Sequence, residues 1–403
     1  MLTRIHSKDG RPVSILGFGC MRLPPPGDGA DETRSIQMIR YAIENGVNYF
    51  DTAYVYGAGK NESLLGKALE GGFREKVFIA TKIPSYLVGK LDSAKKIFET
   101  ELSRLKTDYI DYYLLHMLTD LDMFLRMKDL GVIEWMESLK AEGRIRNIGF
   151  SFHGSKESFE QIVTAYPWDF CQIQFNYMDE FNQAGKSGLL LAASLGIPVI
   201  VMEPIRGGKL AEGLPENILD LFATSPIKRS PAEWALRWVW DYKEVSVILS
   251  GMNDEQQLEE NIRITGEAFP DSLTPEEKEI FKKIKEELQA KTKVPCTACG
   301  YCMPCPFGVD IPGCFSKYNE KFLMPKKGGR FAYFQALGIF SVKPGYASMC
   351  TECGKCESHC PQSIAIRKEL KAVRREFEGP LFRPLIAIAR KVLKIRKPKS
   401  KSN

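Results

Sequence analysis

The 403-residue sequence has no long hydrophobic run and almost no cysteine before residue 296. No segment approaches the roughly 18 uncharged apolar residues that a membrane-spanning helix requires. The amino terminus, MLTRIHSKDG, lacks the apolar core of a secretory signal. Cys20 and Cys171 are the only cysteines in the first 295 residues. We therefore expect a cytoplasmic protein whose cysteines serve a local metal or redox purpose rather than a disulfide scaffold.

Positive charge is scarce outside the carboxyl terminus. The net charge is +6, and the chain from Arg383 onward contains many Lys and Arg residues but no acidic residue. The rest of the chain is therefore close to neutral, which argues against a nucleic-acid-binding protein. In the basic tail, residues 369–403, four apolar residues between 385 and 395 would share one face of a helix. Peripheral contact with an anionic membrane or an acidic redox partner is one interpretation, and a solvated terminus is the other.

Short β-rich segments separated by helical patterns recur across the first two-thirds of the chain. The eight predicted strands are residues 14–21, 47–53, 77–82, 109–116, 145–152, 170–175, 198–204 and 245–251. Eight strands that alternate with helices over about 250 residues favour an α/β fold of the (β/α)8 TIM-barrel type. A doubly wound open sheet is the alternative, but no Gly-x-Gly-x-x-Gly motif follows the first predicted strand.

A barrel of this kind places its catalytic groups at the C-terminal ends of the strands. Polar residues end five of the predicted strands, namely Asp51, Lys82, His116, Ser151 and Glu203. Tyr56 follows the second strand on its loop. Taken singly, each has an ordinary structural interpretation, such as a turn cap, a solvent-exposed lysine or a buried histidine. Their recurrence at successive strand ends instead indicates a single site.

Four of these residues suit the protonation of a carbonyl oxygen. A phenol with an unperturbed pKa of about 10 is a weak acid at neutral pH, and a neighbouring ammonium lowers that pKa. Lys82 would act in this way on Tyr56, and Asp51 would keep Lys82 charged. His116 would orient the substrate oxygen. General acid catalysis of this type contributes about 10²–10⁴-fold to a rate.

The stretch FDTAYVYGAGKNESLLGKAL, together with IATK and YLLH, resembles the aldo/keto reductase family. The segments GFGCMRLP, QIQFN and SGMNDEQQLEEN are similar to the same family, so the resemblance spans about residues 14–264. It implies a (β/α)8 barrel that binds a nicotinamide cofactor, usually NADP, and no metal. It also implies a catalytic tetrad of Asp51, Tyr56, Lys82 and His116, with Tyr56 as the proton donor.

The same resemblance implies how the cofactor is held. Ser151 and Gln172 would bind the carboxamide. The pyrophosphate and adenosine would contact Gly207, Gly208, Gly251, Gln257 and Asn261. Three positions depart from the family pattern: Phe152 replaces an asparagine, Met202 replaces an aromatic residue, and Asn253 replaces a cation that meets the 2′-phosphate. Both NADP and NAD therefore stay candidate cofactors.

Nine of the eleven cysteines lie between Cys296 and Cys360. The run MCTECGKCESHCPQS has the Cys-x2-Cys-x2-Cys-x3-Cys-Pro spacing of bacterial ferredoxins. The run CTACGYCMPCPFGVD keeps the triplet and the Cys-Pro pair but is one residue shorter. Structural zinc sites usually pair two short cysteine knuckles across a gap. Uninterrupted triplets therefore favour iron–sulfur clusters over zinc.

These runs resemble the two-cluster ferredoxin domain, in which the cysteine before proline ligates the other cluster. The resemblance implies one [4Fe–4S] cluster on Cys296, Cys299, Cys302 and Cys360. It implies a second on Cys350, Cys353, Cys356 and Cys305. The shortened spacing leaves Cys314 as an alternative to Cys305.

The expected organisation is a barrel over residues 1–270 and a helical linker over 271–293, which begins with a capping box at Thr274. A small, mainly α-helical ferredoxin-type domain over 294–368 and the basic tail follow. A nicotinamide transfers two electrons as hydride, whereas a cluster transfers one.

Three interpretations of the function stay open. An iron–sulfur aldo/keto reductase acting on a small carbonyl or alcohol would exchange electrons with a redox partner such as a ferredoxin or flavoprotein. Alternatively, the barrel is an altered scaffold within an electron-transfer module, or the clusters only stabilise their domain or sense oxygen.

Overall fold

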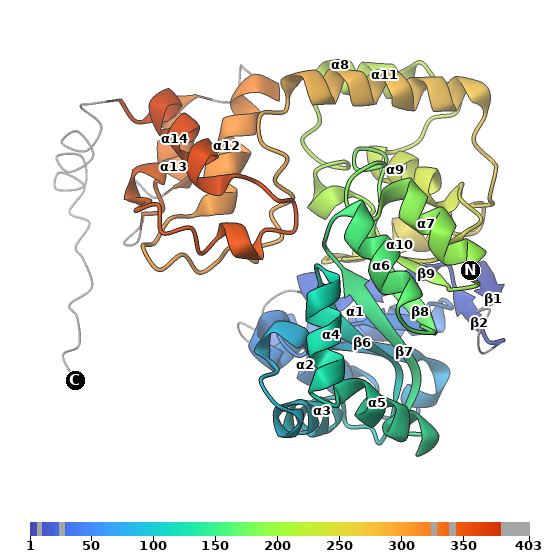
Figure 1. Ribbon diagram of the computed structural model, residues 1–403. Coiled ribbons are helices and arrows are strands. Elements are labelled where there is room, and N and C mark those ends of the chain that lie inside the picture. Colours follow the sequence, from blue (N-terminus) through green and yellow to red (C-terminus); the bar gives the residue numbers. More distant parts are fainter. Residues whose placement is uncertain (6–9, 24–28, 324–328, 338–343, 380–403) are drawn as a thin grey trace. The chain divides into compact units, whose positions relative to one another are not determined.

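The computed structural model describes residues 1–5, 10–23, 29–323, 329–337 and 344–379. The chain forms two compact units (Figure 1). The first contains Met1–Glu212 and Ile227–Glu277, and the second contains Gly213–Pro226 with the chain from Lys278 onward. The apolar segment expected between residues 385 and 395 lies outside the described residues. No helix among the described residues combines the length and apolar character needed to cross a membrane.

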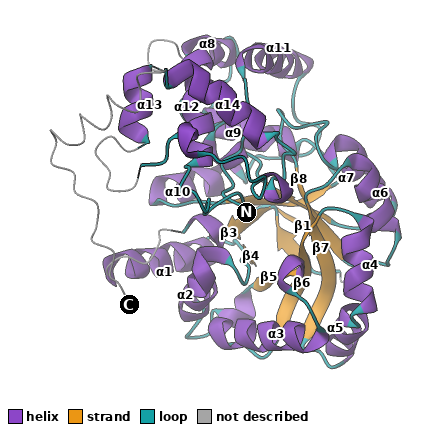
Figure 2. Ribbon diagram, turned by 60° about the vertical axis from the view of Figure 1, so that its left-hand side comes forward, coloured by secondary structure: helices purple, strands orange, loops and turns teal. Residues whose placement is uncertain are grey.

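The first unit is a closed parallel barrel of eight strands surrounded by helices (Figure 2). Around the barrel, β10 pairs with β3, and the remaining strands follow in sequence order to β9. The strands are β3 (Leu16–Gly19), β4 (Tyr49–Asp51), β5 (Phe78–Pro84), β6 (Ile110–Leu118), β7 (Ile145–Phe152), β8 (Phe170–Gln174), β9 (Val199–Met202) and β10 (Val245–Ser250). Each lies within or overlaps a predicted strand, and the closed barrel confirms the predicted fold class.

The chain begins with a structure that the sequence did not predict. Strands β1 (Thr3–Ile5) and β2 (Pro12–Ser14) form an antiparallel pair outside the barrel. The Arg4 guanidinium donates hydrogen bonds to the carbonyl oxygens of Trp240 and Tyr242, at 3.1 and 3.0 Å. These bonds attach the pair to the last helix before β10.

The barrel helices follow the apolar patterns of the sequence. They are α1 (Gly29–Glu44), α2 (Lys60–Ala68), α3 (Leu91–Leu105), α4 (Leu121–Asp129), α5 (Val132–Ala141), α6 (Lys156–Thr164), α7 (Gly185–Ser194), α9 (Pro231–Trp240) and α10 (Glu255–Ile264). Helix α1 begins two residues before Asp31, so Asp31 lies in the first turn, where its negative charge interacts favourably with the helix dipole. Gly46, with φ of +89°, follows the end of α1.

Aromatic side chains fill the end of the barrel where the strands begin. Tyr112 packs against Tyr49 and Phe170, with both pairs of ring centroids 5.0 Å apart. All three rings are fully buried within one apolar cluster. Because this end is filled, the barrel is a packed core rather than a pore, and the polar residues gather at the opposite rim.

The second unit is small and helical. Its helices are α8 (Glu216–Ala223), α11 (Pro275–Lys291), which begins in the first unit, α12 (Ile311–Leu323), α13 (Arg330–Ala336) and α14 (Ile366–Phe377). The start of α11 has the predicted capping box, because Thr274 and Glu277 exchange hydrogen bonds of 3.0 and 3.2 Å. Phe222 of α8 packs edge-on against Phe281 of α11, at 6.2 Å. The core contains a stacked ring pair, Tyr333 and Phe377, at 4.4 Å.

Candidate active site and cysteine loops

Three neighbouring strands deliver the predicted tetrad to one place. Asp51 is the last residue of β4, Lys82 lies near the end of β5, and His116 lies near the end of β6. In the parallel register Asp51 pairs with Ala80, and Pro84 pairs with His116. Because the strands run in the same direction, their C-terminal ends meet at one rim of the barrel.

The Lys82 ammonium is the centre of the arrangement. Its Nζ donates hydrogen bonds to Asp51 Oδ1 at 2.5 Å, to the Thr52 carbonyl oxygen at 2.7 Å and to the Tyr56 hydroxyl at 3.3 Å. Lys82 is fully buried. The Tyr56 and His116 rings meet edge to face, with centroids 5.8 Å apart. The structure therefore brings all four predicted tetrad residues together.

A loop in an unusual backbone conformation positions Tyr56. Gly57, Ala58 and Gly59 all have positive φ, at 55°, 55° and 86°. A Cβ on Gly57 would lie 2.2 Å from Asn61 Oδ1, so this close turn requires glycine. Asn61 also donates from Nδ2 to the Cys20 carbonyl oxygen at 2.7 Å, which ties the loop to the first barrel strand.

Arg104 on α3 holds the other side of this loop. Its guanidinium donates to the Tyr54 carbonyl oxygen at 3.0 Å and to Glu62 Oε2 at 2.9 Å. The other oxygen of Glu62 accepts a hydrogen bond from Thr81, the neighbour of Lys82, at 2.7 Å. A Cβ on Gly66 would lie 2.4 Å from the Arg104 carbonyl oxygen. Glu62 and Gly66, four residues apart on α2, therefore have distinct structural roles. Glu62 anchors Arg104, and Gly66 allows α2 to approach α3.

Burial controls the charges of this site. It raises the pKa of Asp51 and lowers the pKa of Lys82, and in each case the charge of the other residue opposes the effect. Burial also lowers the pKa of His116 well below its ordinary value, and the nearby Lys82 and His153 lower it further. His116 is therefore a neutral imidazole at pH 7, which can donate a hydrogen bond without carrying charge.

The residues expected at the nicotinamide carboxamide lie beside the tetrad. Gln172 of β8 donates from Nε2 to Asp51 Oδ2 at 2.8 Å, so it belongs to the same hydrogen-bond network. Ser151 of β7 accepts a hydrogen bond from the backbone N–H of Met117, the residue after His116, at 2.8 Å. Sequence reasoning assigned neither contact, because both join residues far apart in the chain.

The residues expected at the pyrophosphate and adenosine follow β9 and β10, at the same rim as the tetrad. Gly207 and Gly208 have φ of 67° and 90°, and a Cβ on Gly208 would meet no atom within 4 Å. Gln257 Oε1 accepts from the Asn253 N–H at 3.2 Å, and Asn261 Nδ2 donates to Ser250 Oγ at 3.0 Å. Gly251 packs closely on Arg22, because a Cβ on Gly251 would lie 3.1 Å from Arg22 Cδ.

The two cysteine runs fold into nearly the same loop. Both read Cys-Thr-x-Cys-Gly-x-Cys, at 296–302 and 350–356. Ala298 and Glu352 have φ of 58° and 61°, and the N–H of each donates to the sulfur two residues earlier, at 3.4 Å in both loops. N–H groups that point at cysteine sulfurs stabilise thiolates and the clusters that they bind. The second unit therefore contains an internal repeat.

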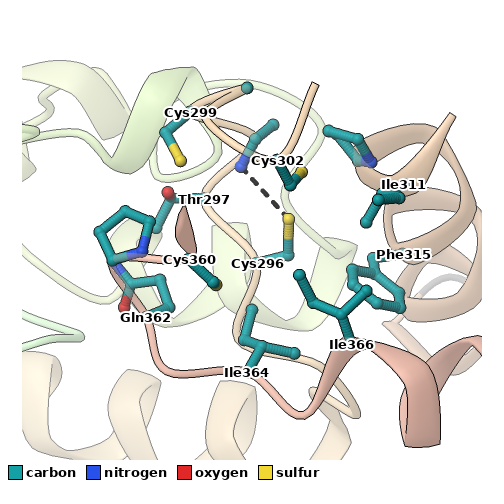
Figure 3. A pocket seen from close by; sticks show the side chains of 14 residues that line it. Cys296, Thr297, Cys299, Cys302, Ile311, Phe315, Cys360, Gln362, Ile364 and Ile366 are labelled. Carbon is teal, nitrogen blue, oxygen red and sulfur yellow. Dashed lines mark hydrogen bonds between the residues drawn. The ribbon is translucent and has the colours of Figure 1, made fainter. Parts of the chain in front are cut away.

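One cavity collects cysteines from both loops (Figure 3). Its lining includes Cys296, Cys299, Cys302 and Cys360. Burial and, after it, the thiols of the other three raise the pKa of Cys302 to about 12. Cys360 comes from the second run, as the predicted exchange of the cysteine before proline requires. Among the described residues, no three His, Cys, Asp or Glu side chains converge in a geometry that suits a single metal ion.

Cys305 and Cys314 have different surroundings. Cys305 lies at the edge of the core, and its thiol and that of Cys350 both raise the pKa of Cys356 after the larger effect of burial. Cys314 is fully buried, and its Sγ donates to the Gly345 carbonyl oxygen at 3.5 Å. Cys305 is therefore only partly buried at the edge of the core, whereas Cys314 is part of the core itself.

Comparisons with known proteins agree with both halves of this description. The profile of the aldo/keto reductase family matches residues 15–285, and that of the 4Fe-4S dicluster domain matches residues 295–365. The chain belongs to the aldo/keto reductase family. Since it also contains a 4Fe–4S ferredoxin-type domain, it is an iron–sulfur oxidoreductase.

Individual relatives match the reductase part of the chain. A probable aldo-keto reductase 1 of Glycine max is 30% identical over 288 residues, which cover 63% of this chain and 81% of the relative. The aldo-keto reductase AKR11C1 of Bacillus halodurans, in its holo form, is 30% identical with a TM-score of 0.59, covering 70% and 96% of the two chains. An aldo/keto reductase of Klebsiella pneumoniae in complex with NADP and acetate shares the fold, at 23% identity and a TM-score of 0.57, over 71% and 96%.

The reductase rim also contains polar residues that the sequence did not single out. Gln174 donates to Asp179 Oδ2 at 2.8 Å, Arg206 Nε lies 3.1 Å from the same oxygen, and Gln183 donates to Gln174 Oε1 at 3.0 Å. The sequence could have indicated Gln174, because Gln172 and Gln174 lie two residues apart on β8 and therefore point to the same face. No sequence pattern indicated that Tyr86 would lie near the site, although its ring centroid is 6.4 Å from that of His116.

Proposed function

We propose that the barrel catalyses hydride transfer between NAD(P)H and a small carbonyl or alcohol substrate, with Tyr56 as the proton donor. The observation that carries the proposal is the contact of one buried ammonium, Lys82 Nζ, with both the Asp51 carboxylate and the Tyr56 hydroxyl. A phenol in this position is ready to release its proton, because the ammonium stabilises the phenolate.

Each residue then has one task in the reduction. When bound, the nicotinamide supplies the hydride to the carbonyl carbon. The Tyr56 O–H gives its proton to the carbonyl oxygen, so the product is an alcohol and Tyr56 becomes a phenolate beside Lys82. Neutral His116 donates a hydrogen bond to the same oxygen and orients it. Asp51 and the Thr52 carbonyl oxygen hold Lys82 in place. Solvent returns the proton to Tyr56.

The residues around the tetrad fit a nicotinamide. A glutamine amide has two donor hydrogens, so Gln172 can bond Asp51 with one and still meet a carboxamide with the other. The turn at Gly207 and Gly208 leaves room for a backbone approach to phosphate, because a Cβ on Gly208 would meet no atom within 4 Å. The Klebsiella pneumoniae reductase, whose structure is a complex with NADP, supports the same cofactor class. Gly251, Gln257 and Asn261 would complete the adenosine end.

We infer that the second unit holds two [4Fe–4S] clusters, which supply one-electron transfer. Cys296, Cys299, Cys302 and Cys360 would hold one. Cys350, Cys353, Cys356 and Cys305 would hold the other. The cavity that joins four cysteines of two loops and the N–H groups aimed at Cys296 and Cys350 fit such groups. A separate redox protein, such as a ferredoxin or a flavoprotein, would connect these one-electron carriers to other reactions.

Anaerobic kinetics test the proposal. Purified protein with full iron content is mixed with NADPH or NADH and a panel of small aldehydes and ketones. Nicotinamide absorbance and the visible absorbance of the clusters are recorded together. Carbonyl-dependent oxidation of the nicotinamide that is lost in Tyr56→Phe supports the assignment. The absence of binding by either nicotinamide contradicts it.

One set of observations favours a second function. Met202 ends β9 where the family has an aromatic ring, and Asn253 follows β10 where the family has a cation. A barrel that had lost its nicotinamide would leave an electron-transfer module on an altered scaffold. This candidate predicts clusters that accept electrons from dithionite and pass them on, in a protein that binds no nicotinamide.

A further inference from the structure

The second cysteine loop lies beside a strongly basic helix. Helix α14 begins six residues after Cys360 and buries Ile366, Leu370, Val373 and Phe377 in the core of its unit. Its other faces carry five Lys or Arg side chains and two Glu side chains. The cavity around Cys296 and Cys302 differs, because α14 contributes only Ile366 to its lining and no charged residue among those that the structure describes lines it.

A groove of about 610 Å³ runs along this helix within the second unit. Its charged and cysteine lining consists of four cations, two carboxylates and one thiol, namely Arg367, Lys371, Arg374, Arg375, Glu352, Glu378 and Cys350. Ala347 and Leu370 add apolar surface to it. Cys350 is one of the proposed cluster ligands, so a molecule in the groove would lie directly against the second cluster.

Ion pairs fix part of this basic surface and leave part of it open. Lys371 pairs with Glu352 at 2.6 Å, and Arg367 pairs with Glu357 at 2.7 Å, which attaches α14 to the cysteine loop. Arg374 and Arg375 are exposed one turn further along, and within the described part of the chain neither pairs with an acid. Of the cations that line the groove, these two residues are therefore the ones left to meet a partner, and Lys368 adds an exposed positive charge on the same helix.

We propose that α14 and the second cysteine loop form the docking surface for a small acidic electron-carrier protein. This proposal rests on the proposed cluster assignment and names the partner's chemistry. A reduced cluster held by Cys350, Cys353, Cys356 and Cys305 would give one electron to the oxidised carrier, so the cluster would be oxidised as the carrier is reduced. Opposite charge accelerates such encounters, and electron-transfer complexes bury small, polar interfaces.

Two features favour a protein carrier over a nucleic acid or a membrane. A cluster ligand in the groove wall is useful only to a redox partner. Glu352 and Glu357 neutralise Lys371 and Arg367, which weakens the surface for a long polyphosphate chain, whereas a local acidic patch of a protein can meet the cations that are left. The groove lining that the structure describes also offers no aromatic ring on which a base would stack.

The test measures electron transfer from the full-length protein with its clusters reduced by dithionite and the excess reductant removed. An oxidised acidic flavodoxin is the probe, and its reduction is followed by stopped flow at several salt concentrations. The test variant is Arg374→Glu with Arg375→Glu. The matched control is Lys282→Glu with Lys283→Glu on α11, which changes the charge of the same unit equally.

We expect the α14 variant to lower the second-order rate constant about tenfold or more at low salt, and the α11 variant less than about twofold. The difference should shrink at high salt, where screening shortens the reach of charge. Iron content and visible absorbance equal to those of the unaltered protein show that the clusters are intact. If the Glu variant fails to assemble, Arg374→Gln with Arg375→Gln should still give a smaller decrease.

Three results would overturn the proposal. The first is an equal effect of the two helix variants, and the second is a rate that does not depend on salt. The third is loss of binding to phosphatidylserine vesicles in the α14 variant while flavodoxin reduction is unchanged, which would assign the surface to a membrane. Because no nicotinamide or carbonyl takes part, these results are independent of the barrel's activity.

Discussion

The barrel and the iron–sulfur unit position their functional groups by different means. In the barrel, a closed sheet over a filled aromatic core holds Lys82 and Asp51 in contact before any ligand is present. In the second unit, a small core around Tyr333 and Phe377 has six of the eight candidate cluster ligands at its edge. The rim of the barrel is therefore preorganised by apolar burial, whereas the cysteine loops depend on what they bind.

The strongest effect that we expect concerns the charge at the centre of the rim. Lys82→Met removes the ammonium and should lower kcat/KM for carbonyl reduction by about 10²–10⁴-fold, because the Tyr56 phenolate loses its stabilising charge. It should also destabilise the barrel by about 3 kcal/mol, since Asp51 is left buried without its partner. A kcat/KM within tenfold of the unaltered value would contradict the role of Lys82.

A double variant separates the two effects of this change. Asp51→Asn together with Lys82→Met leaves no unpaired charge, so the stability should return while the activity does not. All five tryptophans belong to the barrel unit, so their fluorescence during denaturation reports the barrel alone. This measurement keeps barrel stability distinct from the state of the clusters.

Removing the iron should show most directly how far the two units differ. Anaerobic treatment with a chelator should expose the second unit to proteases, because metal binding supplies folding free energy to small cysteine-rich units. The denaturation midpoint of the tryptophan fluorescence should not change, since the barrel has its own core. A parallel loss of barrel stability would show that the two units fold as one.

The exchange of cysteines between the two loops predicts that a single cysteine variant loses either about half of the iron or none of it. Cys360→Ala should remove about half of the iron and acid-labile sulfide, because this residue lines the cavity of the first triplet. Cys314→Ala should leave both contents unchanged, since its thiol donates to a backbone carbonyl within the core. Loss of iron in the Cys314 variant with full retention in Cys305→Ala would reverse the assignment of these two cysteines.

The weakest effect is a pH dependence of the barrel's stability. Burial lowers the pKa of His153 to about 4, with Lys82 adding to the effect and a hydrogen bond to Gln183 opposing it. The unfolded chain binds this proton near pH 6.5, so the free energy of unfolding falls as the pH drops from 6.5 toward 4. Between pH 7.5 and 5 the loss from this residue should be roughly 2 kcal/mol.

The corresponding variant is His153→Gln. Its stability should fall less steeply over this pH range than that of the unaltered protein, as measured by denaturation followed through tryptophan fluorescence. Comparing slopes rather than absolute stabilities cancels the contribution of Asp51, which both proteins share. Equal slopes would show that His153 does not carry the effect.

The sequence predicted the strands of the barrel and the positions of its candidate site residues, but not the hydrogen bonds between residues far apart in the chain. Strands were visible because buried β-branched and aromatic residues form short runs. The candidate tetrad was visible because three of its members end successive predicted strands and Tyr56 follows the first of these on its loop. The bond between Gln172 and Asp51 was not, since it joins β8 to β4 across the barrel. The clamp of Arg104 on Tyr54 and Glu62 was likewise hidden by its distance along the chain.

The eight strands, the capping box of α11 and the two cysteine triplets could be read from the amino-acid sequence, because each depends on neighbours within a few residues. The folded chain was needed to establish that Lys82 meets Tyr56, that α8 packs on α11, and that Cys314 is buried while Cys305 is not. Local spacing controls backbone conformation and periodicity. Which distant side chains meet depends instead on closing the barrel and packing the helices, where many separate burial energies are satisfied together.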